Sequence, residues 1–135
     1  TQREGFVIPD LIRKLRNNSK ELVLKGSGKD VRNFLYIEDV IDSLIFLGKK
    51  GKAGKMYEVG SDDEMTTLEL AQRISRTMML SAKIKVDKPL NVSPTLYHID
   101  KSEITKLGWK ARWNLKRGLK ECIAHAKDIK AREDV

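Results

Sequence analysis

The chain has 135 residues, of which 40% are hydrophobic and 34% charged, and its formal net charge is +8. This length supplies one domain, or a piece of a larger one, that can bury a core without disulfides, and the composition excludes a disordered chain. No apolar run reaches the roughly 18 residues of a membrane span. No membrane partner is therefore expected. The polar start at Thr1 has neither an initiating Met nor a signal-peptide pattern, which suggests a fragment or a trimmed chain instead of a native N-terminus.

The first helix is predicted over Phe6 to Asn18, because its apolar residues repeat at three and four positions and Asn tolerates the left-handed backbone of a helix end. Two strands are expected next, over 21–25 and 31–37. The glycine-rich stretch 26–30 between them is typical of a hairpin loop. Apolar residues on both faces of the second strand predict that both faces are buried, as in an α/β sheet.

A very apolar helix is expected from Glu38 to Leu47, with its acidic start suited to the positive end of the helix dipole. Because it is so apolar, this helix must pack against a large surface. Residues 48–55 consist mainly of Gly and Lys and predict an exposed basic loop. A third strand is expected over 56–60, followed by an acidic loop over 61–65.

Thr66 and Glu69 have the spacing of a capping box, which predicts a helix that runs to about Leu80. A short strand is expected at 84–86. The long loop that follows, 89–97, contains two of the three prolines and is long enough to be functional.

A second capping box is predicted over Asp100 to Glu103, before a short helix that Gly108 would end in the left-handed conformation. Asn114 is expected to cap the last helix, over 115–130, and the tail 131–135 is expected to fray. The resulting order, α-β-β-α-β-α-β-α-α, indicates a single α/β unit.

Two stretches resemble a nucleotide-binding or a metal-binding motif but lack residues that these motifs require. Gly26-Ser27-Gly28 has Val31 where a dinucleotide fingerprint needs its third glycine, a strand follows it instead of a helix, and no Gly-Lys-Ser/Thr closes a P-loop. Asp62-Asp63-Glu64 lacks the glycine and the distal glutamate of a calcium loop. We therefore expect no cofactor site and no metal site on this chain.

The sequence also offers no catalytic group. Cys122, the single cysteine, lies among apolar residues at helical spacing and is expected to be a small buried hydrophobe in a reducing, cytoplasmic setting. His98 and His125 lack a neighbouring Ser, Cys or paired carboxylate for a triad. Ser102 and Thr66 are better explained as helix starts.

Arg32, just past the glycine turn, is the main candidate for a binding residue. A guanidinium held on a strand can bind two phosphate oxygens with parallel hydrogen bonds. An ion pair with Asp30, Glu38 or Asp39 is an equally good explanation by residue type alone, so both interpretations stay open.

The order of the motifs resembles the C-terminal part of extended short-chain dehydrogenase/reductases, the NAD-dependent nucleotide-sugar epimerases and dehydratases. The resemblance extends over nearly the whole chain and keeps the family's order and spacing. The matching segments are VIPDLI (7–12), LVLKGSGKDVRNFLYIEDV (22–40), AGKMYEVGS (53–61) with TTLEL (66–70), IDKSEITKLGW (99–109) and Gly118-Leu119.

The resemblance implies the C-terminal, substrate-binding α/β portion of an extended short-chain dehydrogenase fold, with the Rossmann cofactor domain absent. Arg32 would hold the diphosphate of the nucleotide sugar, Val7-Ile8-Pro9 would line the substrate cleft, and Leu24-Lys25 would lie near the nucleobase. The strand and helix over 34–47 would return to pack on the Rossmann domain of the same parent chain. That missing domain would bind NAD or NADP, and the chain alone would be inactive.

The departures from the family pattern matter. The catalytic Tyr-x-x-x-Lys pair lies upstream in the family; here only Tyr97 and Lys101 have this spacing, in the wrong region. Where a second arginine usually precedes the Asp-x-Ser segment, this chain has Leu96, Tyr97 and His98. Glu58 replaces the common asparagine. The diphosphate is therefore expected to be held more weakly, or the parent enzyme to be unusual.

The resemblance leaves several alternatives open. The parent could be an isomerase or a lyase, since epimerisation, dehydration, decarboxylation and reduction all occur in such enzymes. The alternative to an enzyme portion is a stand-alone scaffold module that uses its basic surface to bind anionic partners. Exposed apolar surface would permit a homodimer or a domain swap. Nucleic acid is disfavoured, because the basic residues are scattered and aromatics amount to only 6%.

Overall fold

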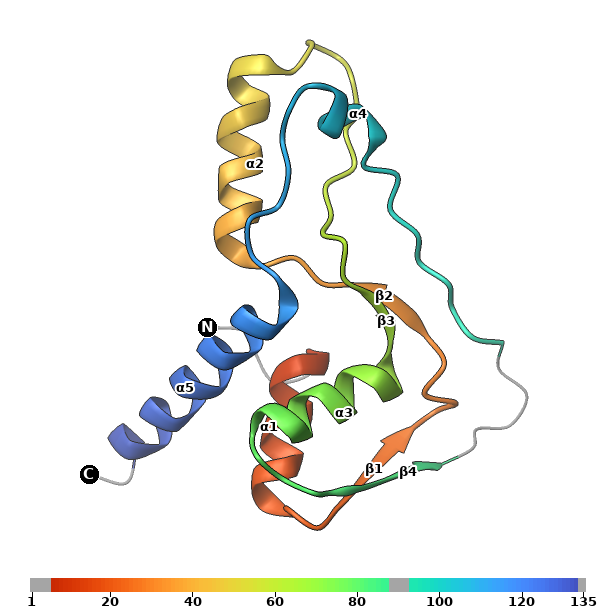
Figure 1. Cartoon of the computed structure of the whole chain (residues 1–135), viewed down its shortest axis with the longest axis vertical. Helices are drawn as coiled ribbons and strands as arrows, with labels where there is room; N and C mark the ends of the chain where they lie inside the picture. Colours follow the sequence, from red (N-terminus) through yellow and green to blue (C-terminus); the bar gives the residue numbers. More distant parts are fainter. Residues whose placement is uncertain (1–5, 88–92, 134–135) are drawn as a thin grey trace.

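The computed structural model describes residues 6–87 and 93–133 (Figure 1). Helices and strands alternate for most of its length, which confirms the α/β class. The elements are α1 (Val7–Asn17), β1 (Glu21–Lys25), β2 (Val31–Asn33), α2 (Ile37–Lys50), β3 (Glu64–Thr66), α3 (Thr67–Thr77), β4 (Lys83–Asp87), α4 (Ser102–Lys106) and α5 (Leu115–Glu133).

The strands form two separate two-stranded sheets. β1 pairs in parallel with β4, from Glu21 opposite Lys83 onward, and β2 pairs antiparallel with β3. The predicted hairpin between the first two strands is therefore wrong. Its glycine-rich loop is tied to the start of α3 instead, because Leu68 N–H donates to the Gly28 carbonyl (3.0 Å) and Thr67 N–H to the Asp30 carbonyl (3.0 Å).

Two predicted strands and one predicted loop differ from the structure along the path from β2 to β3. The strand expected over 31–37 ends at Asn33, and its side chains are half-buried or exposed instead of buried on both faces. Residues 56–60 are extended but form no strand, and β3 occupies part of the expected acidic loop. A strand needs a hydrogen-bonded neighbour, and among the described residues the backbone of 56–60 has none.

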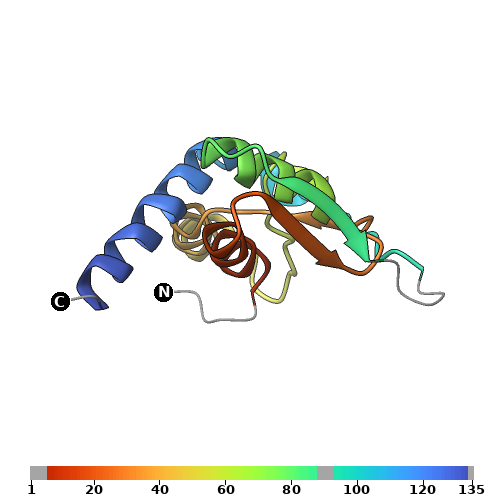
Figure 2. The same ribbon diagram turned by 90° about the horizontal axis from the view of Figure 1, so that it is seen from below.

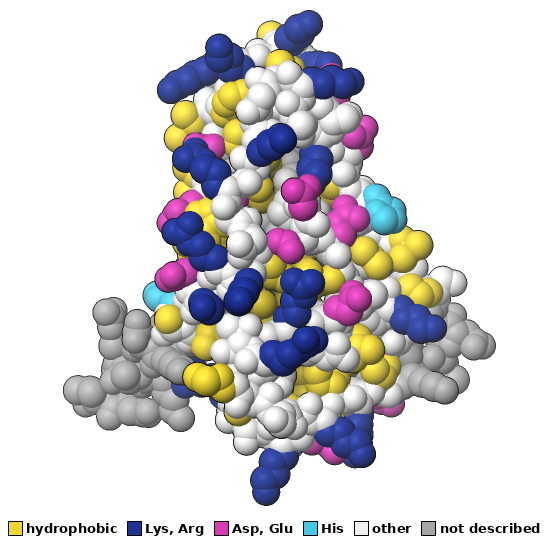
Figure 3. Space-filling view, in the orientation of Figure 1, with side chains coloured by type: hydrophobic (Ala, Val, Ile, Leu, Met, Phe, Trp, Pro, Cys, Tyr) yellow, Lys and Arg dark blue, Asp and Glu magenta, His cyan; other side chains and the backbone are white. Residues whose placement is uncertain are grey.

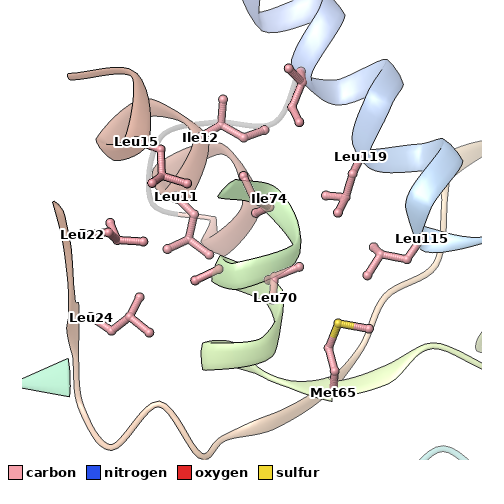
Figure 4. Packing of buried hydrophobic residues seen from close by; sticks show 12 residues of the cluster. Leu11, Ile12, Leu15, Leu22, Leu24, Met65, Leu70, Ile74, Leu115 and Leu119 are labelled. Atoms are coloured by element: carbon pink, nitrogen blue, oxygen red, sulfur yellow. The ribbon is translucent and has the colours of Figure 1, made fainter. Parts of the chain in front are cut away.

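The core lies where α3 packs between α1 and α5 (Figures 2 and 4). Leu15, Leu70 and Ile74 are completely buried there. Burial of one such side chain stabilises the fold by about 1.5–3 kcal/mol. The cluster is Leu11, Ile12, Leu15, Leu22, Leu24, Met65, Leu70, Ala71, Ile74, Leu115, Leu119 and Ile123.

Three of the predicted helix ends are confirmed. The capping box forms: Thr66 Oγ1 accepts from Glu69 N–H (3.2 Å), and the Glu69 carboxylate accepts from Thr66 N–H (2.8 Å). Asn114 Oδ1 accepts from Arg117 N–H (2.9 Å) at the start of α5. Gly108 has a φ of +101°, as its role after α4 requires.

Three other helix ends differ from the prediction. Asn18 is extended (φ −138°), and its side-chain oxygen accepts from the N–H groups of Lys20 and Glu21, so it guides the chain into β1. The second capping box does not form: α4 has Lys101 at its N-cap with no side-chain cap bond. α5 runs to Glu133, so most of the tail predicted to fray is helical, while residues 134–135 lie outside the described part.

The helix α2 leaves its apolar face open. Its buried residues are polar, Asp39 and Ser43, and no residue of α2 belongs to the core cluster. Four large apolar side chains are between 51% and 65% exposed: Ile37, Ile41, Leu44 and Ile45. Hydrophobic atoms show along this side of the molecule in Figure 3, whereas Lys and Arg are spread over the whole face among acidic groups. Within the described residues, the large surface expected to cover this helix is not present.

No helix in the described part of the chain is both long and apolar enough to cross a membrane.

Candidate functional site

A large open cavity lies between α1, the segment that joins β2 to α2, and α5. Its volume is about 1360 Å³. Residues along the whole length of α1 form one wall, the face of α5 from Leu115 to Ala126 forms the other, and β2 with its exit forms the floor. A site of this kind, mostly apolar with a few polar groups, is the usual form of a small-molecule site.

Arg32 lies in β2 on the rim of this cavity, and its side chain is exposed. The three carboxylates that could have neutralised it are engaged elsewhere. Asp30 accepts from Thr95 N–H (2.8 Å), Glu38 from Trp113 Nε1–H (3.1 Å), and Asp39 from two backbone N–H groups. Among the described residues, Arg32 has no ion pair and no hydrogen bond to its side chain, so its donors are available to a ligand.

Two stacked aromatic residues, Tyr36 and Trp113, line the same cavity as Arg32. The rings of Tyr36 and Trp113 stack with centroids 3.9 Å apart, and the Arg117 guanidinium lies 3.6 Å from the Trp113 ring centroid. A Cβ added at Gly118 would come within 3.1 Å of the Tyr36 ring, so the glycine lets α5 approach this closely. Burial raises the pKa of the Tyr36 hydroxyl.

The buried carboxylate of Asp39 holds this wall in place. It is only 2% exposed, and it accepts from Arg112 N–H (3.1 Å) and Trp113 N–H (2.9 Å). Asp42, one turn later on α2, accepts from Trp109 Nε1–H (2.9 Å), and a hydrogen bond from Arg112 lowers its pKa. The first turn of α2 thus positions the chain that leads into α5.

The residues assigned by resemblance fall into two groups. Val7, Ile8 and Pro9 line the cavity together with Arg32. Leu24 is 3% exposed in the core, and Lys25 is exposed outside the cavity; neither lines it. The role of all six residues in binding stays a prediction.

Sequence reasoning missed other parts of the site. Asn33 exchanges two hydrogen bonds with the backbone of Ser61 (2.9 and 3.0 Å) and so fixes the floor of the cavity. Trp113 and Tyr97 also line it. An aromatic residue in a proline-containing loop was the available signal for Tyr97, but no sequence signal placed it near Arg32.

The described residues hold no catalytic arrangement. His98 pairs with Glu64 (Nδ1 to Oε2, 2.9 Å), which lowers the pKa of the glutamate. Burial raises the pKa of the half-buried Cys122 thiol and keeps it in its unreactive form. Lys101 binds the Ser61 carbonyl (2.8 Å), and it is not on one helix face with Tyr97, so the chance spacing of these two forms no pair. No group of three metal-ligating side chains occurs in the part that the structure describes.

Comparisons with known proteins agree on one family. Residues 1–60 match the profile of the NAD dependent epimerase/dehydratase family. A human dTDP-D-glucose 4,6-dehydratase is 36% identical over 124 residues, which are 87% of this chain and 35% of the relative.

Solved structures of such enzymes share the fold. A Bacillus anthracis dTDP-glucose 4,6-dehydratase in complex with NAD superimposes with a TM-score of 0.79 at 21% identity, over 94% of this chain and 40% of that one. A Thermotoga maritima UDP-glucose 4-epimerase with UDP-glucose gives 0.79 at 21% identity, over 94% and 41%. The chain thus spans 35% to 41% of the length of these three proteins.

Proposed function

Because the chain belongs to the NAD-dependent epimerase/dehydratase family, we propose that it is the nucleotide-sugar-binding portion of such an enzyme, with Arg32 as the group that binds the diphosphate. The observation that carries the proposal is an arginine that lines a large cavity and whose side-chain donors have no partner among the described residues, while the carboxylates that could have paired with it bind other groups. Relatives that act on dTDP-glucose or carry UDP-glucose support a nucleoside diphosphate as the anion.

In the described part of the chain, the glycine turn does not fit the pyrophosphate of NAD or NADP. The turn at Gly26 and Gly28 leads into a strand, so no helix N-terminus points at a bound pyrophosphate there. In the proposed enzyme the cofactor, which accepts the hydride from a sugar carbon, is bound by another part of the parent protein. Residues of this chain bind and orient the nucleotide sugar, and the chain alone is catalytically inactive. The proposed setting is reducing and cytoplasmic.

The cofactor-binding part would cover the open face of α2. The apolar side chains of α2 and the extended backbone of 56–60 both lack partners among the described residues. An exposed apolar helix face and an extended segment without backbone partners are both what a larger α/β sheet presents before its neighbouring strand and helices are added. This supports a Rossmann domain of the same parent protein as the partner; a homodimer or domain swap through this face is the competing occupant.

Calorimetric titration of the chain with dTDP, UDP and GDP tests the binding role. We expect at least one of them to bind, and Arg32→Ala to weaken that binding by about 10- to 100-fold, the range for hydrogen bonds to a charged group. Arg73→Ala is the matched control, because Arg73 is an exposed arginine outside the cavity. Wild-type chain that binds none of the three would contradict the proposal and favour the scaffold alternative.

Inactivity is tested separately. The chain is incubated with NAD or NADP and dTDP-glucose or UDP-glucose, and the nicotinamide absorbance and sugar products are followed. We expect no turnover. Sustained turnover that scales with the concentration of the chain would contradict the proposal that the chain is inactive without the cofactor-binding part.

A further inference from the structure

The segment 95–97 lies along the edge of β2 that does not pair with β3, and one isolated bridge joins it to the small sheet that carries Arg32. Val31 and Leu96 form a parallel bridge, in which Val31 N–H donates to the Thr95 carbonyl (2.9 Å) and Tyr97 N–H to the Val31 carbonyl (3.3 Å). The Asp30 carboxylate accepts from Thr95 N–H (2.8 Å) and secures the segment from its other end. The position of Tyr97 is therefore fixed by backbone contacts to β2.

This register places Tyr97 beside Arg32. Val31 lies opposite Leu96, so the next residues along the two parallel chains, Arg32 and Tyr97, are also neighbours and point to the same face. On the other side of β2, Arg32 lies opposite Met65 of β3, which is buried in the core. The three side chains form a row across the sheet that begins in the core and ends at the cavity, which Arg32 and Tyr97 both line.

The hydroxyl of Tyr97 has no hydrogen-bond partner in the described part of the chain, and the side chain is 66% exposed. The residue follows Leu96, the bridge partner of Val31, as Arg32 follows Val31. An aromatic ring whose backbone is already held on a cavity rim loses little conformational entropy when it binds a ligand. A phenol donates well to a charged oxygen.

We propose that Tyr97 is a second ligand-binding residue, whose hydroxyl donates a hydrogen bond to the same diphosphate that Arg32 holds. The inference rests on the proposed function, because it takes the diphosphate as the ligand. Arg32 supplies the positive charge, and Tyr97, on the adjacent segment 95–97, fixes the orientation of the diphosphate. Together they make a two-point contact that a single exposed arginine does not provide.

The test is calorimetric titration of the chain with dTDP, and with thymidine as the ligand without phosphate, for wild type, Tyr97→Phe and Tyr97→Ala. We expect Tyr97→Phe to weaken dTDP binding by about five- to tenfold and to leave thymidine binding unchanged, because only the hydroxyl is removed. Leu96→Ala is the matched control: Leu96 is 63% exposed on the same segment but faces away from the cavity row. It should change binding less than twofold.

A double-mutant cycle gives the second readout. If both residues contact one diphosphate, Tyr97→Phe should have little further effect on dTDP binding in the Arg32→Ala background. Full additivity would contradict a shared ligand group.

The outcomes separate this inference from the proposed function. If Arg32→Ala weakens dTDP binding and Tyr97→Phe does not, Arg32 keeps its role and Tyr97 loses the one assigned here. If Tyr97→Ala weakens both ligands while Tyr97→Phe weakens neither, the ring stacks on the base and the hydroxyl contact is wrong. If wild type binds no dTDP, UDP or GDP, both proposals fail together. Equal damage from Leu96→Ala would mean that the segment, not the hydroxyl, had been disturbed, and would also overturn the inference.

Discussion

Two regions of this molecule are held together by different forces. The packed region, made of α1, β1, α3, β4 and α5, is stabilised by a continuous apolar core. The α2 arm, residues 37–63 with 99–113, joins its own two segments through polar contacts at Asp39 and Asp42 and leaves apolar side chains of α2 exposed. The helix α2 is very apolar, yet the residues that it buries are polar. This is expected of a helix whose covering surface lies outside the described residues.

The largest expected effect tests the packed region. Leu70→Ala, at a completely buried position in α3, should lower the free energy of unfolding by about 2–5 kcal/mol, because it removes apolar contacts and leaves a cavity. The matched control is Leu44→Ala on α2, where the side chain is 65% exposed and we expect a change within about 0.5 kcal/mol. Urea unfolding measures both. Similar losses at the two sites would mean that α2 is packed in this chain, contrary to the comparison.

The next effect tests how the two segments of the α2 arm are joined. Asp39→Ala should cost about 2–4 kcal/mol, because the N–H groups of Arg112 and Trp113 would lose their acceptor in a buried place. Asp42→Ala, on the same helix but partly exposed, should cost less. Urea unfolding gives the stability, and the combined fluorescence of Trp109 and Trp113 reports on the local structure. An Asp39→Ala chain as stable as the Asp42→Ala chain would refute the anchoring role.

A smaller effect is expected at the start of α3. Thr66→Ala removes the acceptor of the capping box and should cost about 1 kcal/mol. Thr77→Ala, in the last turn of the same helix, removes only a back-bond to the Arg73 carbonyl and should be neutral or slightly stabilising. Thermal unfolding of the two variants side by side checks the difference. Equal melting temperatures would show that the cap contributes nothing here.

The smallest effect is electrostatic. Hydrogen bonds from Lys106 and Lys55 lower the pKa of Glu103 from 4.5 to about 2. A carboxylate whose pKa is depressed by folding stabilises the fold above its unfolded pKa, and that contribution is lost as the pH falls from about 4.5 toward 2. Because the group is exposed, salt should screen most of the contribution. An NMR titration of the Glu103 carboxyl should show the low midpoint, and Lys106→Ala should raise it; a midpoint unchanged by the substitution would contradict the assigned cause.

Local patterns were enough to predict most helices and their caps. The capping box at Thr66, the cap at Asn114 and the strand Glu21–Lys25 depend on neighbouring residues, and all three are confirmed. Strand pairing depends on partners far away in the sequence. The parallel pairing of β1 with β4 could not be read from a glycine loop that is equally typical of a hairpin.

The candidate site divides in the same way. The sequence marked Arg32 by residue type and resemblance, but its freedom from ion pairs depended on where Asp30, Glu38 and Asp39 turned out to bind. The position of Tyr97 beside it follows from a single parallel bridge between segments more than sixty residues apart, which no local pattern encodes.

The most direct test of the central claim compares a diphosphate with its nucleoside. Titrations of wild type and Arg32→Ala with dTDP and thymidine give the ratio of the two affinities for each chain. If Arg32 holds the diphosphate, wild type should bind dTDP at least about tenfold more tightly than thymidine, and the ratio should fall to near one in Arg32→Ala. A ratio that is the same in both chains would contradict the account.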